Sequence, residues 1–320
     1  MRPLRWGIAG PGRIADIMAA EFAHVQNGEL VAVGSRSLDR AQAFAQRHGI
    51  AEAYGSYDEL MAADLDAIYL ATPHAQHTEL ALAAIEAGKA LLVEKSFTTS
   101  VADTERIVAA ARAKDVFVME AMWTRFLPAV ARLRALVADG SLGQVRAVQG
   151  DLFAFRDYDP ADRLFNPELG GGAVFDLGVY VISFAQQFLG MPDVVHAVGG
   201  RFPNGVESEV GMLFGWSDGR FASEAIGFTV PGPGRQIVAG TDGWVEVKPR
   251  FHRADTLVVH RRGEAAVEEF LPKRGSGYCY EVEHVGECLA AGLTESPIMS
   301  LDDTLAVQRL MGEVLAQLGR

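Results

Sequence analysis

Short apolar runs alternate with amphipathic segments over the first 120 residues of the chain. Residues 30–34, 66–71 and 91–93 are almost wholly apolar, as is typical of parallel strands that are covered on both faces. The segments between them carry apolar residues at helical spacing. This alternation predicts an α/β domain with a doubly wound parallel sheet. The expected helices are residues 14–24, 39–48, 57–63, 78–87 and 101–114, and further strands are expected from residue 4, at 53–54 and at 116–120.

The pattern changes after residue 122, because β-rich segments then outnumber helices. Asp-Gly turn signals at residues 217–219 and 241–243 predict hairpins. We therefore expect a Rossmann domain over residues 1–122 and an α+β domain with a mostly antiparallel sheet over residues 123–320. The strands expected in the second domain are 145–155, 194–202, 210–216, 220–228, 236–240, 243–247, 257–261 and 265–271, and the helices are 128–139, 170–189, 281–291 and 301–318.

Charge and composition narrow the class of protein. The net charge of −12 and the absence of a Lys/Arg-rich run argue against a nucleic-acid partner. The chain has two cysteines and no C-x-x-C pair, so two reduced thiols in a cytoplasm are expected rather than a disulfide framework. We expect no apolar segment to be long enough to span a membrane. The short apolar run after Arg5 is interpreted as a strand and not as a signal peptide.

The first strand leads into a glycine-rich loop that predicts a dinucleotide site. Gly10 and Gly12 allow a tight turn and a close approach to a pyrophosphate, and Ala15 keeps the following helix close to the strand. The helix N-terminus offers free N–H groups and the positive end of its dipole to the phosphates. The residues expected to bind the cofactor here are Gly7, Gly10, Pro11, Gly12, Arg13 and Ile14.

The end of the second strand bears on the choice of cofactor. An acidic residue about 20 residues after the glycines would bind the ribose hydroxyls of NAD. This chain instead has Ser35, Arg36 and Arg40, whose hydroxyl and guanidinium groups suit the 2′-phosphate of NADP. The alternative is a solvated helix start with Ser37 as N-cap and Arg40 on the surface. We expect NADP, with NAD as the second possibility.

Two further strands end in polar residues at the edge where open α/β sheets bind ligands. Ala71, Thr72 and Pro73 are expected to line the cofactor, with His74 and His77 holding the turn. No carboxylate or cysteine completes a ligand set with these histidines, so no metal is expected.

Glu94 and Lys95 come at the end of the next strand. An ammonium group near a nicotinamide ring is disfavoured by desolvation and by the charge of the ring, so Lys95 could exchange a proton with a substrate hydroxyl. A structural ion pair is the alternative.

In the second half, Gly170, Gly171 and Gly172 precede a helix with Asp176 and Tyr180 four residues apart. The glycines leave room for a ligand or another backbone. The tyrosine could pass a proton and the aspartate could bind a substrate hydroxyl. Alternatively, Tyr180 packs in a buried helix.

Taken together, these residues resemble the Gfo/Idh/MocA family of NAD(P)-dependent oxidoreductases, and most of all its dihydrodiol dehydrogenase and NADP-dependent D-xylose dehydrogenase branch. The resemblance covers the whole chain and rests on motifs that include the glycine loop, Ala71–His74, Glu94-Lys95, 119–126 and Gly170–Gly172. It implies a second domain with an open sheet that often mediates oligomer contacts.

The resemblance also implies roles for individual residues. Lys95 is implied as the catalytic lysine, with Asp176 and Tyr180 beside the substrate. Trp123 and Arg125 match positions that approach the nicotinamide. Tyr180 stands where many sugar and inositol dehydrogenases have histidine, which marks the dihydrodiol-type branch. Ser96 replaces the proline that the family has after the lysine, so a looser loop or a different isomer preference is expected. Substrate specificity is expected among residues such as Phe153, Arg156, Arg163 and Phe165.

These observations predict an NADP-dependent oxidoreductase that acts on the CH–OH group of a sugar, polyol or cyclic diol. It is expected to form a dimer or tetramer through its second sheet. One alternative is a cofactor-binding regulatory protein without catalysis. Another is an enzyme that keeps its cofactor and cleaves glycosides through transient oxidation.

Overall fold

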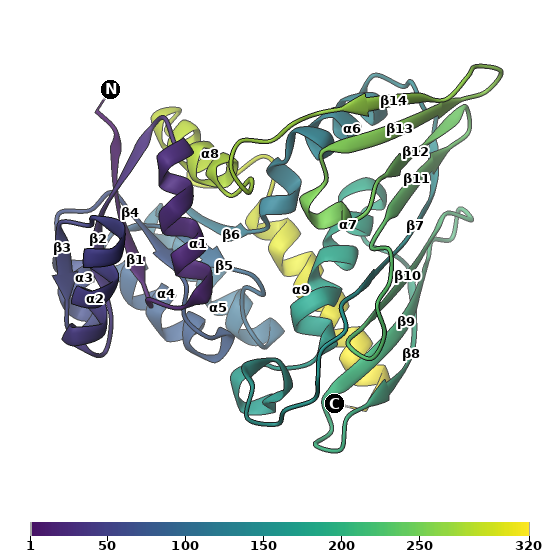
Figure 1. The fold of residues 1–320 in the computed structure, drawn as a ribbon. Helices are drawn as coiled ribbons and strands as arrows, with labels where there is room; N and C mark the ends of the chain where they lie inside the picture. The colour runs from purple at the N-terminus through teal and green to yellow at the C-terminus, as the bar shows by residue number, and fades with distance from the viewer. Residues whose placement is uncertain (1, 320) are drawn as a thin grey trace. The chain divides into compact units, whose positions relative to one another are not determined.

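The computed structural model describes residues 2–319, and these form two compact units (Figure 1). The first unit holds the described residues up to Trp123 together with Arg274–Thr304, and the second holds Thr124–Lys273 and the described residues from Leu305 on. The sequence predicted a single break after residue 122. The start of the second unit lies close to that break, but the chain later returns to the first unit.

A buried carboxylate explains this return. Glu21, at the end of α1 (Arg13–Glu21), accepts backbone N–H groups that precede and open helix α8 (Cys279–Ala290). These groups belong to Ser276, Gly277, Tyr278 and Cys279, at distances from 2.6 to 3.3 Å. A carboxylate at a helix N-terminus is favourable because free N–H groups and the helix dipole meet it there. Residues more than 250 positions apart are thereby joined.

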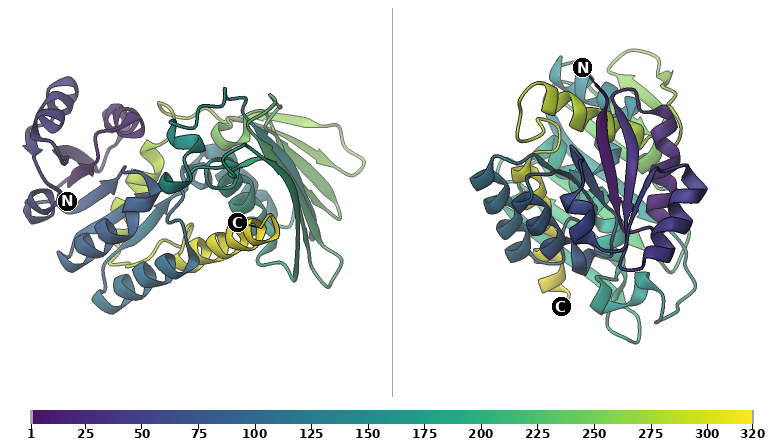
Figure 2. Two further views of the ribbon diagram at one scale, coloured as in Figure 1. Left: turned by 90° about the horizontal axis from the view of Figure 1, so that it is seen from below. Right: turned by 90° about the vertical axis from the view of Figure 1, so that its left-hand side faces the viewer.

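The first unit is built on a six-stranded parallel sheet in the order β3-β2-β1-β4-β5-β6, which confirms the predicted Rossmann topology. Helices cover both of its faces (Figure 2). The strands are β1 (Leu4–Ala9), β2 (Gly28–Gly34), β3 (Glu52–Tyr54), β4 (Ala67–Leu70), β5 (Ala90–Glu94) and β6 (Val118–Ala121), and the other helices are α2 (Leu38–His48), α3 (Tyr57–Ala62), α4 (His77–Glu86) and α5 (Val101–Lys114). Strand order reverses between β1 and β4, which places the ligand edge of the sheet at their carboxyl ends.

The second unit has an eight-stranded sheet in the order β14-β13-β12-β11-β7-β10-β9-β8. All neighbours are antiparallel except β7 and β10, as predicted for a mostly antiparallel sheet, and both predicted hairpins are present. Helices lie against one face only (Figure 2). The strands are β7 (Val145–Phe153), β8 (Val194–Arg201), β9 (Glu207–Gly215), β10 (Phe221–Gly227), β11 (Gln236–Gly240), β12 (Gly243–Val247), β13 (Thr256–Arg261) and β14 (Val267–Phe270), and the helices are α6 (Pro128–Ala138), α7 (Val179–Leu189) and part of α9 (Leu301–Gln317).

Two sequence-based expectations about residues 170–189 were wrong. A regular helix was expected over residues 170–189. The structure instead has a π-helix at Val174–Gly178, and the regular helix α7 starts after it, at Val179. The stretch Pro167–Leu189 is also long and apolar enough to cross a membrane by length and composition, although no such segment was expected. Since 83% of its apolar window is buried inside the protein, it is a core segment of the second unit.

Candidate functional site

The glycine loop has the geometry that a pyrophosphate requires. Gly10 has a φ of +97°, and a Cβ there would lie 2.9 Å from the Thr72 Cγ2 atom. Gly12 is the N-cap of α1 and makes no side-chain bond to the first N–H groups of this helix. Ala15 is fully buried beneath the loop, as predicted. A helix N-terminus with N–H groups to offer, and a turn that excludes a side chain at Gly10, together fit a dinucleotide.

Gly7 was expected in the glycine loop, and its position differs. It lies inside β1 and not in the loop, and a Cβ there would be 2.6 Å from the Leu65 Cδ1 atom and 3.1 Å from the Leu60 Cδ1 atom. Its lack of a side chain is therefore explained by packing under the sheet.

Polar groups follow the carboxyl end of β2 next to this loop. The Gly10 N–H bonds to the Gly34 carbonyl oxygen at 3.0 Å, which places residue 35 near the glycine turn. Ser37 accepts the Arg40 N–H at 3.4 Å as the N-cap of α2, so the alternative interpretation holds for that serine. Arg36 and Arg40 are exposed, and no carboxylate of residues 2–319 lies within ion-pair distance of either. Both lie close enough to the Tyr57 hydroxyl to lower its pKa, although burial raises that pKa more.

The two histidines after β4 hold the next loop, as predicted. His77 is fully buried, with its ring nitrogens 3.0 Å from the Phe97 carbonyl oxygen and 2.8 Å from that of Thr72. Burial lowers the pKa of His77. The Nε2 atom of His74 lies 3.1 Å from the Lys95 carbonyl oxygen and 3.2 Å from the Ser96 nitrogen, so it bonds one or the other according to its tautomer. Among residues 2–319 there is no group of three or more side chains suited to a metal ion.

Lys95 directly follows β5, with its backbone held on both sides. Its N–H bonds the Glu94 Oε2 atom at 3.0 Å, and the Glu94 Oε1 atom accepts the Tyr69 hydroxyl. The peptide bond from Lys95 to Ser96 is cis. The Phe97 N–H then bonds Glu120 at 3.1 Å. This network positions the lysine backbone at the ligand edge of the sheet.

Sequence reasoning missed three residues around Glu94. Tyr69 is fully buried in β4, and its pKa is raised well above its ordinary value by burial and by the charges of Glu94 and Glu281. Glu281, in the first turn of α8, is fully buried with no hydrogen-bond partner for either carboxyl oxygen, and burial raises its pKa well above the ordinary range. Tyr278 stacks on Trp123 with ring centroids 4.2 Å apart. No local pattern in the sequence indicates this cluster. Tyr69 lies within an apolar strand, and Tyr278 and Glu281 are some 190 positions from Glu94 in the chain.

The second unit brings Asp176 and Tyr180 onto adjoining helical segments. Asp176 lies in the π-helix, 3.6 Å from an Arg163 nitrogen, and Tyr180 is buried at the start of α7. A Cβ on Gly171 would lie 2.7 Å from the Asn166 backbone, so at least this glycine makes room for another backbone. The Tyr180 ring also lies against His252, with centroids 5.4 Å apart.

Arg125 is held inside the second unit by α7. Its guanidinium donates to the Ser183 hydroxyl at 3.0 Å and to the Gln186 side-chain oxygen at 2.7 Å, and the side chain is 2% exposed. These bonds use much of the donor capacity of the Arg125 guanidinium. Arg125 therefore has a structural role in the second unit, in addition to the contact with a cofactor that was expected of it.

Comparison with known proteins agrees with this architecture. Residues 4–122 match the oxidoreductase family with an NAD-binding Rossmann fold, and residues 130–246 match the GFO/IDH/MocA C-terminal domain. The chain belongs to the Gfo/Idh/MocA oxidoreductase family. The predicted family membership is therefore confirmed, and with it an NAD(P)-binding Rossmann domain.

Two full-length relatives carry the same name. The trans-1,2-dihydrobenzene-1,2-diol dehydrogenase of Sus scrofa is 35% identical over 99% of this chain and 97% of its own length. The enzyme of the same name from Homo sapiens is 34% identical, with the same coverage.

Solved structures share the fold over the whole chain. The aldose-aldose oxidoreductase of Caulobacter crescentus, in complex with glycerol, has a TM-score of 0.90 and 27% identity over 100% of this chain and 99% of its own. The 3-ketoreductase KijD10 of Actinomadura kijaniata, in complex with NADP and TDP-benzene, has a TM-score of 0.85 and 25% identity over 99% and 98%.

Proposed function

We propose that this protein is an NADP-dependent oxidoreductase that acts on the CH–OH group of a sugar, polyol or cyclic diol. The observation that carries the proposal is the placement of Lys95 at the ligand edge of a Rossmann sheet, with its backbone held by Glu94. Relatives named for diol and aldose oxidoreduction support the substrate class.

In the proposed reaction the residues of this chain manage the proton. The bound nicotinamide supplies the acceptor for a hydride from the substrate carbinol carbon. Lys95 takes the hydroxyl proton as the carbonyl forms, with assistance from Tyr180, so that one hydride and one proton leave the alcohol. Asp176 anchors a substrate hydroxyl. In the reverse direction Lys95 returns the proton to the carbonyl oxygen.

The preference for NADP is supported by two arginines that pair with no carboxylate of the described residues. Arg36 and Arg40 follow β2 at the position where NAD-preferring folds place an acidic residue. Guanidinium groups bind phosphate oxygens with good geometry and keep their charge at all relevant pH values.

We also propose a homo-oligomer formed through the second sheet. By strand register, six exposed apolar side chains project from the face that carries no helix, and Val198 and Phe270 are 75% and 68% exposed. Exposed apolar side chains that share one face of a sheet are typical of an association surface, and a second copy of the chain presents the same surface. The six residues are Val194, Val198, Leu213, Phe221, Trp244 and Phe270.

Replacement of Lys95 tests the proposed mechanism. Lys95→Ala should lower kcat by about 10²–10⁴-fold, the usual contribution of a positioned acid or base, while the Kd for NADP changes by less than about threefold. Lys114→Ala is the matched control, because Lys114 is an exposed lysine in the last turn of α5 and pairs with Glu86 at 2.8 Å. Reduced cofactor is followed with a panel of aldoses, inositols and trans-diols. Full activity in Lys95→Ala would overturn the mechanism.

The same assay separates the two alternative functions. A regulatory protein would bind NADP with no turnover of any alcohol or ketone in either direction. A glycoside-cleaving enzyme would retain its nucleotide through purification and release sugar without net reduction of cofactor.

A further inference from the structure

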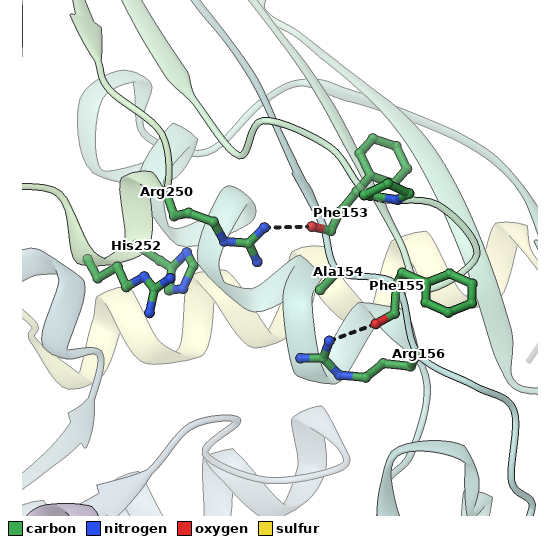
Figure 3. Close-up of a pocket in the computed structure, with 8 residues that line it drawn as sticks. Phe153, Ala154, Phe155, Arg156, Arg250 and His252 are labelled. Carbon is green, nitrogen blue, oxygen red and sulfur yellow. Dashed lines mark hydrogen bonds between the residues drawn. The ribbon is translucent and has the colours of Figure 1, made fainter.

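The second unit contains a hollow of about 430 Å³ whose lining is basic (Figure 3). Three backbone segments line it: the end of β7 with the residues that follow it, the loop between β10 and β11 through Pro231, and the segment between β12 and β13. Three arginines and a histidine line it, and no lining residue is acidic. The protein has a net charge of −12, so its overall charge does not explain this cluster of cationic side chains. The lining residues are Phe153, Ala154, Phe155, Arg156, Pro231, Arg250, His252 and Arg253.

The structure orients two of these guanidinium groups. Arg250 donates through Nη1 to the Phe153 carbonyl oxygen at 3.0 Å, and Arg156 donates through Nη1 to the Phe155 carbonyl oxygen at 2.8 Å. In Figure 3 both guanidinium groups lie on the opposite side of this segment from the two phenyl rings. Each arginine has five N–H donors, so one bond to a carbonyl fixes direction and leaves capacity for an acceptor.

No protein carboxylate neutralises these cations. Across residues 2–319, none lies within ion-pair distance of Arg156, Arg250 or Arg253. Asp151 is within electrostatic reach of Arg250, but its Oδ2 atom is bound to the Gly234 N–H at 2.9 Å. Burial, followed by the charges of Arg253 and Arg156, lowers the pKa of Arg250, so like charges repel here. A bound anion would relieve that repulsion.

The hollow adjoins the residue proposed to assist proton transfer. His252 belongs to its lining and lies against the Tyr180 ring, with centroids 5.4 Å apart. The His252 carbonyl oxygen also accepts the Thr124 hydroxyl at 2.9 Å, which fixes this segment. A group bound among the arginines would therefore lie one side chain away from Tyr180.

We propose that this hollow binds an anionic group, a phosphate or a carboxylate, on the substrate itself, so that the protein acts on an acidic or phosphorylated sugar or polyol in preference to a neutral one. This inference rests on the proposed function for the identity of the reaction. Guanidinium groups suit both anions, because their paired N–H groups match the spacing of the oxygens.

Binding is tested first, without turnover. Calorimetry with inorganic phosphate at constant ionic strength compares the wild type with the double variant Arg156→Gln/Arg253→Gln, whose two side chains are exposed and make no side-chain bond to another element. Arg262→Gln, on an exposed arginine bonded to the Thr241 carbonyl oxygen, is the control. The double variant should bind phosphate at least about tenfold more weakly, and the control should match the wild type.

Two outcomes would overturn the inference at this stage. One is phosphate binding that is absent or equal in all three proteins. The other is phosphate that saturating NADP displaces, because the anion recognised would then be that of the cofactor.

Turnover is tested second, with glucose 6-phosphate, gluconate and glucose and with NADP present. The wild type should prefer at least one of the anionic compounds in kcat/KM. In the double variant, the ratio of kcat/KM for that compound to kcat/KM for glucose should fall toward one, and in the Arg262→Gln control it should match the wild type. Turnover with no preference for an anion contradicts the inference and leaves the proposed function standing. Phosphate binding that depends on Arg156 and Arg253, with no oxidation of any alcohol, supports the anion site and overturns the proposed function.

Discussion

Arg36, just before α2, and Arg40, in the first turn of α2, are both within electrostatic reach of Tyr57. Among the described residues no carboxylate lies within ion-pair distance of either arginine, whereas Arg47 of α2 pairs with Asp16 at 2.8 Å. The contrast matters because an arginine that is already paired gains little from a phosphate. The two unpaired residues retain their full donor set for a ligand.

Arg36→Ala should raise the Kd for NADP by about 10–100-fold, since a hydrogen bond between charged groups contributes about 1.5–3 kcal/mol. The Kd for NAD should change by less than about threefold, because NAD lacks the 2′-phosphate. Fluorescence titration with both nucleotides measures this, and Arg47→Ala serves as the control. Equal losses for NADP and NAD would show that Arg36 does not recognise the 2′-phosphate.

Glu224 is a buried acid that the proposed reaction does not use. It lies on the helix-covered face of β10 and accepts the Gln236 amide at 2.7 Å, across Gly150 of β7. A Cβ on Gly150 would lie 2.3 Å from the Gln236 side chain, so only glycine allows this contact. Burial raises the pKa of Glu224 well above its ordinary value of 4.5, with Asp151 adding to the effect.

The sign of the pH dependence follows from that shift. Above pH 4.5 the unfolded chain releases the Glu224 proton and the folded chain retains it, so wild-type stability falls as pH rises toward the folded pKa. Glu224→Gln removes this loss and keeps an acceptor for Gln236. Its free energy of unfolding should exceed that of the wild type by about 1.4 kcal/mol per pH unit across this window, and by little at pH 4.5.

Urea unfolding at pH 5 and pH 8 measures the difference. Glu313→Gln, on an exposed position of α9, is the control and should show no such trend. A Glu224→Gln advantage that is the same at both pH values would contradict the argument.

At the scale of elements, the turn between β1 and α1 combines two glycines with different requirements. Gly10 needs a positive φ and an empty Cβ position against Thr72. Gly12 has a φ of −101°, which other residues also adopt. A Cβ added at Gly12 would have the Ala71 carbonyl oxygen as its nearest neighbour, at 3.9 Å, so the fold itself tolerates a side chain there. Only the approach of a pyrophosphate explains why the second position should also be glycine.

This difference predicts two distinct variants. Gly10→Ala should lower the free energy of unfolding by about 1–3 kcal/mol and weaken cofactor binding. Gly12→Ala should leave the free energy of unfolding almost unchanged and still weaken NADP binding about tenfold or more. Urea unfolding and nucleotide titration separate the two effects. Gly12→Ala that binds NADP normally would contradict the proposed role of this loop.

At the scale of the whole molecule, the second sheet has one covered face and one open apolar face. Leu213 and Val267 allow a direct test, because they are 46% and 47% exposed and project from opposite faces of the sheet. Because the two side chains are similarly exposed but lie on opposite faces, substituting each one distinguishes a specific interface on one face from a general effect of surface hydrophobicity.

Leu213→Glu should convert the oligomer to a monomer, since a buried unpaired carboxylate at an interface costs several kcal/mol of association free energy. Val267→Glu should leave the oligomer intact. Analytical ultracentrifugation of both variants and the wild type measures this. A monomeric wild type, or an oligomer that persists in Leu213→Glu, would refute the proposed interface.

Much of the architecture could be predicted from local patterns. Apolar runs, helical spacing and the two Asp-Gly turns located nearly every element, since hydrophobic burial imposes the same period on sequence and structure. Ser56 caps its helix as expected from its place before residues 57–63, and Ser37 caps α2 as the alternative interpretation of that segment proposed. The loop residues at the carboxyl ends of β1, β2, β4 and β5 were also foreseen, because parallel strands bring those ends to one edge.

The sequence by itself determined the class of fold, the family and the edge of the sheet where the predicted cofactor residues gather, because each of these depends on short-range periodicity or on a compact motif. Only the tertiary structure decided what surrounds them. It returned α8 to the first unit through Glu21, placed Tyr69 and Glu281 beside Glu94, and gathered Arg156, Arg250 and Arg253 around one hollow. Those contacts join residues far apart in the chain, and the desolvation that shifts their pKa values exists only once the chain has folded.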